Sequence, residues 1–234
     1  MDEIAWPRPL TERQLTQLEQ YRQLLLTWNE RMNLTSITDE TQVYVKHFYD
    51  SLAVLSIPLW STAAKRGGQV IDIGTGAGFP GLPLAIVEQG MNFVLCDSLQ
   101  KRVTFLEAVV QELGLQNVRC VHARSEDLAR DLEYRGQFDV VVSRAVARLN
   151  ILMELMCPFL RLHGVGFSYK GPGFDDERAD GMRAAKKLHA KIQAVDTYTL
   201  PLDMGARTIV AFEQMSSLPH TYPRKAGIPQ RKPL

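Results

Sequence analysis

A glycine-rich segment flanked by two acids is the part of the chain best suited to hold a cofactor. The segment VIDIGTGAGFPG contains Gly74, Gly76, Gly78 and Gly81. Asp72 ends the apolar run before the loop, and Asp97 follows the next apolar run. Glycine is favoured where the backbone approaches a ligand closely or adopts a positive φ. We therefore predict a cofactor site here, with a turn that only serves packing as the alternative.

The glycine spacing fits two kinds of adenosine cofactor. The last three glycines satisfy G-x-G-x-x-G, and Asp97 lies 21 residues beyond the first of them, as a dinucleotide site requires. A pyrophosphate needs free N–H groups at a helix start, whereas S-adenosylmethionine lacks phosphate and carries an amino group and a sulfonium. Asp72 would repel a pyrophosphate, and Pro80 removes one helix-start N–H group. We therefore expect S-adenosylmethionine, and a dinucleotide is the alternative.

Asp97 is placed to accept hydrogen bonds from both ribose hydroxyls, and capping the following helix is its alternative role. Ser125 and Glu126 begin another predicted helix, and their spacing alone favours capping there.

The residues after the predicted fourth strand limit the chemistry of methyl transfer. A pyrimidine carbon requires an attacking cysteine, and no cysteine ends the predicted strands 138–143 or 164–170. Cys157 lies in an apolar helical pattern, where a buried side chain is expected. Exocyclic adenine amines are commonly methylated beside an Asn/Asp-Pro-Pro-aromatic segment, but residues 143–146 read Ser-Arg-Ala-Val. No carboxylate or histidine stands beside Ser143 as an obvious base.

Arg144 is the candidate catalytic residue. Its guanidinium can stack on a purine, bond guanine O6 and touch the cofactor, while an ion pair with Glu126 or Asp97 is the alternative. His47 is a lone histidine in an amphipathic segment, where a packed or surface position is the more usual one. Lys170 ends a predicted strand, where it either meets a phosphate or is solvated.

The elements that must position these residues alternate along the chain. Apolar runs predict strands at 69–73, 92–96, 117–121, 138–143, 164–170, 192–200 and 207–213. Helical patterns lie between them at 80–89, 99–113, 125–131, 148–160 and 175–190. This alternation predicts an α/β, Rossmann-like fold with a mostly parallel seven-stranded sheet, helices on both faces and a ligand site at the strand C-termini.

Three regions follow from these patterns. Residues 1–66 form a helical extension, with an amphipathic helix over 11–32 and a second helix that starts at Asp39 and runs to the region of Pro58. Residues 67–215 form the cofactor-binding domain. Residues 216–234 form a basic, proline-containing tail that we expect to be extended, to contact RNA and to leave cofactor affinity unchanged.

Composition indicates a cytosolic protein with a basic C-terminal quarter. The 234 residues are 45% hydrophobic, enough for one α/β core with an appendage. Three widely spaced cysteines suggest neither disulfides nor zinc, we expect no other metal, and no signal peptide or membrane segment is evident. The net charge is only +1, but residues 178–234 hold ten Lys or Arg against four acids, as a polyanion-binding face would. The candidate RNA contacts are Lys186, Lys187, Arg224, Lys225, Arg231 and Lys232.

From about residue 20 to the C-terminus the chain resembles the small-subunit ribosomal RNA guanine-N7 methyltransferases, also called glucose-inhibited division protein B. The shared segments are WNERMNLTSI (28–37), KHFYDSL (46–52), DIGTGAGFPGLPLAI (72–86), DSLQKRVTFL (97–106), ARSEDL (123–128), SRAVARL (143–149), YKGP (169–172) and YPRKAGIPQRKPL (222–234). The resemblance implies a class I methyltransferase fold, S-adenosylmethionine as cofactor and 16S ribosomal RNA or the small subunit as partner. The cofactor contacts that it implies are Gly74, Phe79, Asp97, Ser98, Leu99, Ser125, Glu126 and Arg144.

Two other functions keep the same fold. One is a methyltransferase for a small molecule or a protein, which leaves the basic C-terminal quarter unexplained. The other is a non-enzymatic RNA-binding protein with a degenerate cofactor loop, although an intact Asp72, loop glycines and Asp97 argue against degeneration.

Overall fold

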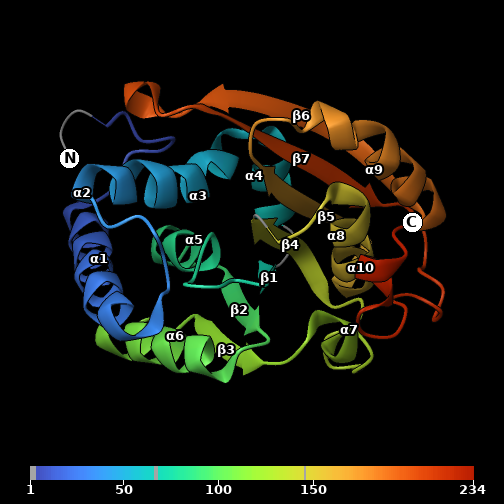
Figure 1. Ribbon diagram of the computed structural model, residues 1–234, viewed down its shortest axis with the longest axis horizontal. Coiled ribbons are helices and arrows are strands. Elements are labelled where there is room, and N and C mark those ends of the chain that lie inside the picture. The colour runs from blue at the N-terminus through green and yellow to red at the C-terminus, as the bar shows by residue number, and fades with distance from the viewer. Residues whose placement is uncertain (1–3, 66–67, 145) are drawn as a thin grey trace.

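The computed structural model describes residues 4–65, 68–144 and 146–234, and its centre is a seven-stranded sheet (Figure 1). The strands are β1 (Gln69–Ile73), β2 (Asn92–Asp97), β3 (Val118–His122), β4 (Phe138–Arg144), β5 (Leu160–Lys170), β6 (Ala190–Thr199) and β7 (Ala206–Gln214). Their order is β3-β2-β1-β4-β5-β7-β6. The first five strands pair in parallel, and β7 is antiparallel to both neighbours. The predicted Rossmann-like fold with a mostly parallel sheet is therefore confirmed.

Helices cover both faces of this sheet. The helices of the N-terminal part are α1 (Glu12–Met32), α2 (Glu40–Gln42), the π-helical stretch η1 (Val43–Tyr49), α3 (Asp50–Leu52) and α4 (Pro58–Ala64). Those that follow are α5 (Gly81–Val87), α6 (Gln100–Glu112), α7 (Ser125–Leu128), α8 (Leu149–Met156), α9 (Asp175–Lys187) and α10 (Ile228–Arg231). None of the helices in the described part of the chain is long and apolar enough to cross a membrane.

Side chains alternate along the buried strands and feed separate cores. Ile71 and Ile73 pack with α8 and α9 on one face, in a cluster that includes Leu152. Val70 faces the other way and packs with Trp60 of α4 and Leu84 of α5. Alternation with a period of two places neighbouring residues of a strand on opposite faces. Asp72 therefore lies on the same side of the sheet as Val70, facing α5.

The N-terminal extension shares a core with the sheet domain. Thr11 and Gln14 form a capping box at the start of α1, and Tyr21 of this helix packs in a buried cluster with Phe79 and Phe105. The predicted second helix is present as a helical run from residue 40 to 56, which includes the π-helical η1. The predicted boundary between the regions, at residues 66 and 67, lies outside the described residues.

The C-terminal tail is folded, so the prediction of an extended and poorly ordered segment is wrong. Arg224 forms an ion pair with Glu154 of α8, with Nη2 2.6 Å from Oε2, and Pro229 of α10 is buried. Arg130 and Arg135 donate hydrogen bonds to the backbone carbonyls of Pro223 and Tyr222. The composition misled the prediction because the acid that fixes the tail comes from a distant helix.

Candidate active site

A pocket of about 160 Å³ opens at the carboxyl ends of β1, β2 and β3. It is lined by Ile73, Gly74, Cys96, Asp97, Ser98, Ala123, Arg124, Ser125, Glu126, Val146 and Leu155. Open α/β sheets bind ligands at this edge, close to where the strand order reverses between β1 and β4. Five of the predicted cofactor residues, Gly74, Asp97, Ser98, Ser125 and Glu126, thus lie around one cavity.

Protein acceptors already occupy the N–H groups of the glycine loop. The Gly76 N–H donates to Asp97 Oδ2 at 2.9 Å, and the Gly81 N–H donates to Asp72 Oδ2 at 2.8 Å. The N–H groups of Gly78 and Phe79 donate to the carbonyl of Thr75. A pyrophosphate bound at a helix start needs such donors for itself. The loop therefore disfavours a dinucleotide and suits a cofactor without phosphate, as its charge predicts.

Gly74 is the glycine whose freedom the pocket requires. Its φ is +68°, and a Cβ added there would lie 2.8 Å from Cγ2 of Val146, which also lines the pocket. Both the backbone conformation and the close approach select glycine at this position. Gly78 has φ of +101°, but it faces Leu82 and the hydroxyl of Tyr21, so its role is in the core.

Asp97 supports the start of the following helix, which was the alternative role predicted for it, and its ribose contact stays a prediction. It is only 3% exposed and accepts hydrogen bonds from the N–H groups of Gly76 and Leu99 and from Nη1 of Arg102. The bond to Leu99 supports the start of α6. A carboxylate has about four acceptor sites. Three of these sites are in use, so one remains for a ribose hydroxyl. A second site becomes available if Arg102 moves away.

Asp72 is a buried acid with one oxygen engaged and one free. Oδ2 accepts hydrogen bonds from Thr75 Oγ1 and the Gly81 N–H, whereas Oδ1 is buried without a hydrogen-bond partner among the described residues. Burial raises the pKa of Asp72 to about 7. The side chain does not line the pocket, but it leaves an unsatisfied acceptor beneath the loop.

Arg144 pairs with an acid that the sequence interpretation missed. Its Nη1 lies 3.0 Å from Asp50 Oδ2 and also donates to the carbonyls of Lys46 and His47. The alternative partners proposed for it, Glu126 and Asp97, are therefore wrong. Asp50 is 4% exposed and also accepts a hydrogen bond from Tyr198 Oη at 2.6 Å. Its position in the KHFYDSL segment was the available signal.

His47 is held neutral in a packed position. Its ring stacks on Phe79 with centroids 4.4 Å apart, and Nε2 lies 2.9 Å from Thr35 Oγ1. Its Nδ1 lies 3.3 Å from Nη2 of Arg144. Burial and the positive charge of Arg144 lower the pKa of His47 to about 3. The ring is therefore neutral near pH 7, with both nitrogens engaged.

Phe79, Leu99 and Arg144 lie apart from the pocket that holds five of the predicted cofactor residues. Phe79 is 6% exposed and stacks between Tyr21 and His47, and Cζ of Arg144 lies 4.8 Å from its ring centre. Leu99 is 43% exposed. Neither side chain, nor that of Arg144, lines the cavity.

Three further side chains differ from their simplest interpretation. Ser125 does not cap α7, because its hydroxyl donates to the carbonyl of Leu155 at 2.9 Å. Lys170 is neither solvated nor free to meet a phosphate, since it pairs with Glu177 at 2.9 Å. Cys96 lines the pocket, but burial raises its pKa to about 12, so its thiol is protonated. Cys157 is buried, as expected.

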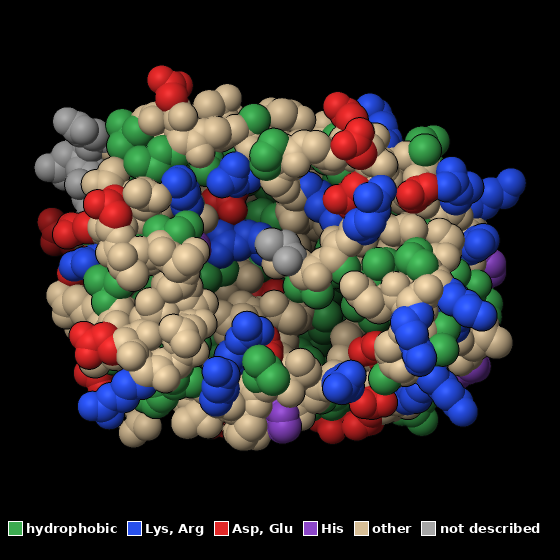
Figure 2. Space-filling model, viewed as in Figure 1, with side chains coloured by type: hydrophobic (Ala, Val, Ile, Leu, Met, Phe, Trp, Pro, Cys, Tyr) green, Lys and Arg blue, Asp and Glu red, His purple; other side chains and the backbone are tan. Residues whose placement is uncertain are grey.

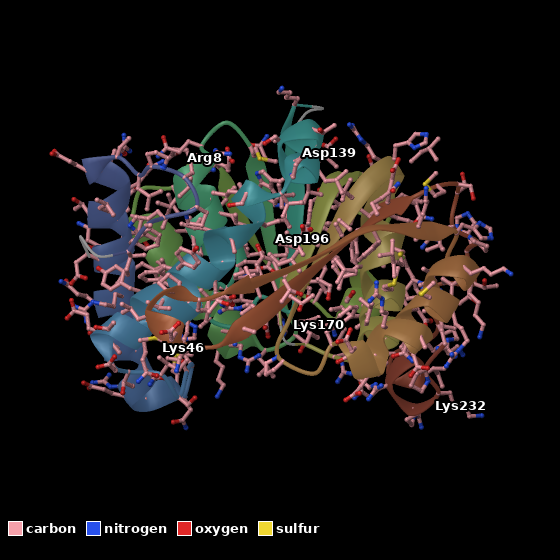
Figure 3. All side chains as sticks on the ribbon, turned by 90° about the horizontal axis from the view of Figure 1, so that it is seen from above. Arg8, Lys46, Asp139, Lys170, Asp196 and Lys232 are labelled. Atoms are coloured by element: carbon pink, nitrogen blue, oxygen red, sulfur yellow. The ribbon has the colours of Figure 1, made fainter. Side chains whose placement is uncertain are left out.

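The basic residues predicted to contact RNA divide into two groups. Lys186, Lys187, Lys225, Arg231 and Lys232 are exposed. Arg224 instead pairs with the fully buried Glu154, so its charge is neutralised inside the protein. Figure 2 shows a hollow near the middle of the face that carries the strand ends, with Lys and Arg side chains along its rim. Figure 3 shows Lys170 near the middle of the molecule, Lys46 toward one side and Lys232 far toward the other.

The described residues contain no group of three or more His, Cys, Asp or Glu side chains able to hold a metal ion.

Three features together define the class of Rossmann-like methyltransferases. They are the sheet order, the pocket at the strand ends and the glycine loop whose N–H groups bind Asp97 and Asp72. Ala145, within the segment after β4, lies outside the described residues.

Comparison with known proteins identifies the family. The model of the GidB family, rRNA small subunit methyltransferase G, matches residues 14–204. Ribosomal RNA small subunit methyltransferase G of Brevibacillus brevis is 46% identical over 96% of this chain and 93% of its own length. The Carboxydothermus hydrogenoformans protein of the same name is 45% identical over 92% of this chain and 90% of its own. The chain therefore belongs to the rRNA small subunit methyltransferase G family, which confirms the resemblance and the methyltransferase prediction.

Solved structures share the fold at low identity. A mutant of MtNAS in complex with S-adenosylmethionine superposes with a TM-score of 0.54 at 16% identity, covering 88% of this chain and 73% of that one. A SAM-dependent methyltransferase from Methanosarcina mazei gives 0.53 at 12% identity, covering 68% of this chain and 98% of that one.

Proposed function

We propose that this chain transfers the methyl group of S-adenosylmethionine to N7 of a guanine in 16S ribosomal RNA, in the cytoplasm. The observation that carries the proposal is the glycine loop whose N–H groups bind Asp72 and Asp97, in a chain of this family. Such a loop favours a phosphate-free, positively charged cofactor over a dinucleotide.

The residues around the pocket fit this cofactor. Asp97 has one acceptor site left for a ribose hydroxyl, Gly74 permits close approach, and Ser98 and Glu126 line the cavity. The buried Oδ1 of Asp72, which has no hydrogen-bond partner among the described residues, leaves an acceptor beneath the loop, and this carboxyl gains negative charge as pH rises through its pKa of about 7. When bound, the cofactor supplies an electrophilic methyl group on a sulfonium. The chain itself must then orient the acceptor, because alignment alone accounts for much of the rate of such displacements.

The groups near Arg144 do not suit proton removal. His47 is neutral with both nitrogens engaged, and Asp50 is bonded by Arg144 and Tyr198. The Cys96 thiol is protonated near pH 7, because burial raises its pKa to about 12. Guanine N7 offers its lone pair without losing a proton, so this set of groups is sufficient for it. Methylation of an amine or a carbon would need a base or a nucleophile.

Arg144 is the residue that we propose to orient the guanine. Its side chain is 13% exposed, at the end of β4, and is held on one side by Asp50 and the carbonyl of Lys46. A guanidinium fixed in this way is already ordered before the base arrives, and its N–H groups that have no partner among the described residues suit guanine O6. Lys186, Lys187, Lys225, Arg231 and Lys232 are exposed for contacts with RNA phosphates.

The decisive experiment is methyl transfer with the full chain. Radiolabelled S-adenosylmethionine is incubated with 16S ribosomal RNA or with small ribosomal subunits from a strain that lacks this activity, and the nucleosides are analysed by mass spectrometry. We expect 7-methylguanosine as the labelled product, and the variant Asp97→Ala serves as the control for cofactor binding. Label in another nucleoside, or transfer only to protein or small molecules, contradicts the proposal. Cofactor titration without any transfer to RNA also contradicts it.

A further inference from the structure

The C-terminal segment contacts the wall of the cofactor pocket. Glu126 lines the pocket, and its Oε1 accepts a hydrogen bond from the N–H of Gly227 at 3.1 Å. Gly227 has φ of +79°, a conformation that L side chains rarely adopt. The glycine therefore allows the chain to turn so that its N–H group reaches the carboxylate.

A second contact reaches the pocket through α8. Glu154 is fully buried and receives the backbone N–H, Nε and Nη2 of Arg224 at 2.9, 2.9 and 2.6 Å. The next residue, Leu155, lines the pocket, and its carbonyl accepts the hydroxyl of Ser125. The position of α8 at the pocket thus depends on a buried carboxylate whose partner comes from the tail.

The tail is also anchored independently of the pocket. Arg130 and Arg135, which follow α7, donate to the carbonyls of Pro223 and Tyr222, and α10 packs next to α8 (Figure 1). These bonds place Arg224 and Gly227 opposite Glu154 and Glu126. Without Arg224, a buried charge would be left unpaired, and α8 would have to shift or Glu154 would have to take up a proton.

We propose that Arg224 and Gly227 are positioning residues of the cofactor site: the tail fixes Glu126 and α8, and so holds two walls of the pocket in their binding geometry. This inference rests on the proposed cofactor. It reverses the expectation that the tail serves RNA alone and leaves cofactor affinity unchanged.

The test is direct titration of the purified full-length chain with S-adenosylmethionine by calorimetry, at a temperature where circular dichroism shows each variant folded. We expect Arg224→Gln to raise the cofactor dissociation constant at least fivefold. In turnover with saturating RNA, KM for the cofactor should rise by a similar factor, while kcat stays within twofold and KM for RNA is unchanged. The matched control, used in the calorimetric titration alone, is the double variant Lys225→Gln/Lys232→Gln, which removes two exposed tail charges that are assigned to RNA. Its dissociation constant for S-adenosylmethionine should stay within twofold of the wild type.

Arg224→Lys provides a second variant in case Arg224→Gln does not fold. A lysine keeps the positive charge beside Glu154 but loses the forked contact. We therefore expect a smaller rise, of about threefold, in the cofactor dissociation constant. Cofactor affinity within twofold of the wild type in a folded Arg224 variant would overturn the inference, as would an equal loss in the control. If the wild type itself does not bind S-adenosylmethionine, the proposed function fails instead.

Discussion

Replacing Asp72 with asparagine should remove a specific pH dependence from the stability of the protein. Asp72 is fully buried, and burial raises its pKa from 3.8 to about 7. Between these two values the folded protein retains a proton that the unfolded chain releases. The free energy of unfolding therefore falls as pH rises through this window. Asparagine does not titrate, and it can still accept hydrogen bonds from Thr75 and Gly81.

The size of the effect follows from the two pKa values. Each pKa unit of difference between the folded and unfolded states is worth about 1.4 kcal/mol of unfolding free energy. Part of this free energy is already lost at pH 5, and the loss is nearly complete at pH 8. Between pH 5 and pH 8 the linkage relation gives a loss of about 2.5 kcal/mol for the wild type relative to Asp72→Asn. This is a large fraction of the stability of an ordinary domain.

The measurement is urea unfolding followed by circular dichroism at pH 5, 6, 7 and 8, for both proteins. Taking the difference between them cancels the other titrating groups. Asp176→Asn, which changes an exposed acid on α9, is the matched control, and its difference from the wild type should stay within about 0.5 kcal/mol at every pH. A pH-independent difference between the wild type and Asp72→Asn would show that the carboxyl titrates as in the unfolded chain, and would refute the argument.

Four other predictions concern binding, catalysis and the core of the site. If the positive groups of the cofactor lie near Asp72, its dissociation constant should fall as pH rises from 6 to 8, and should lose this trend in Asp72→Asn; a flat wild-type profile in calorimetric titration contradicts the contact. At saturating cofactor, which removes the effect of Asp72 on binding, the single-turnover rate should be nearly flat between pH 6 and 8, because His47, with a pKa of about 3, does not titrate there; a rate that climbs tenfold per pH unit would restore a general base. The triple variant Lys225→Gln/Arg231→Gln/Lys232→Gln should reduce the slope of log K against log salt for RNA by about 0.7–0.9 per lost phosphate contact, and an unchanged slope in filter binding removes these residues from the interface. Arg144→Ala should cost about 3–5 kcal/mol in urea unfolding, because it leaves the buried Asp50 with weaker partners, and a cost below about 1 kcal/mol would contradict the buried pair.

The fold was largely predictable because its signals are local. Each predicted strand overlaps an observed one, and Gln69–Ile73 has the predicted limits. Strand β5 begins four residues earlier than the predicted start, at Leu160, because the irregular pairing between Phe138 and Val140 lets β5 extend beside β4. The π-helical turn of η1 could not be predicted, since a helical pattern of apolar residues does not reveal which carbonyl each N–H group meets.

The meeting of candidate cofactor residues at one pocket was predictable from the positions of glycines and acids at strand ends, whereas contacts with residues distant in the sequence were not. Gly74, Asp97 and Glu126 meet at the pocket because the ends of parallel strands lie along one edge. The partner of Arg144 was missed, because Asp50 is 94 residues away and nothing in local spacing joins the two. The prediction for the tail failed for the same reason. Its prolines and basic residues suggested disorder, but Arg224 pairs with the buried Glu154, which lies far away in the sequence.

The N-terminal helices hold Arg144, the proposed catalytic residue, although their sequence suggests an appendage. The π-helical η1 directs the carbonyls of Lys46 and His47 to the guanidinium of Arg144. Asp50, the first residue of α3, contacts the same guanidinium. Such turns often occur at functional sites because they free backbone acceptors from the regular helical pattern. The end of β4 is therefore covered by acceptors that hold the guanidinium of Arg144. A guanidinium held in this way is suited to keeping a base in line for displacement, which is the one contribution that guanine N7 requires of the protein.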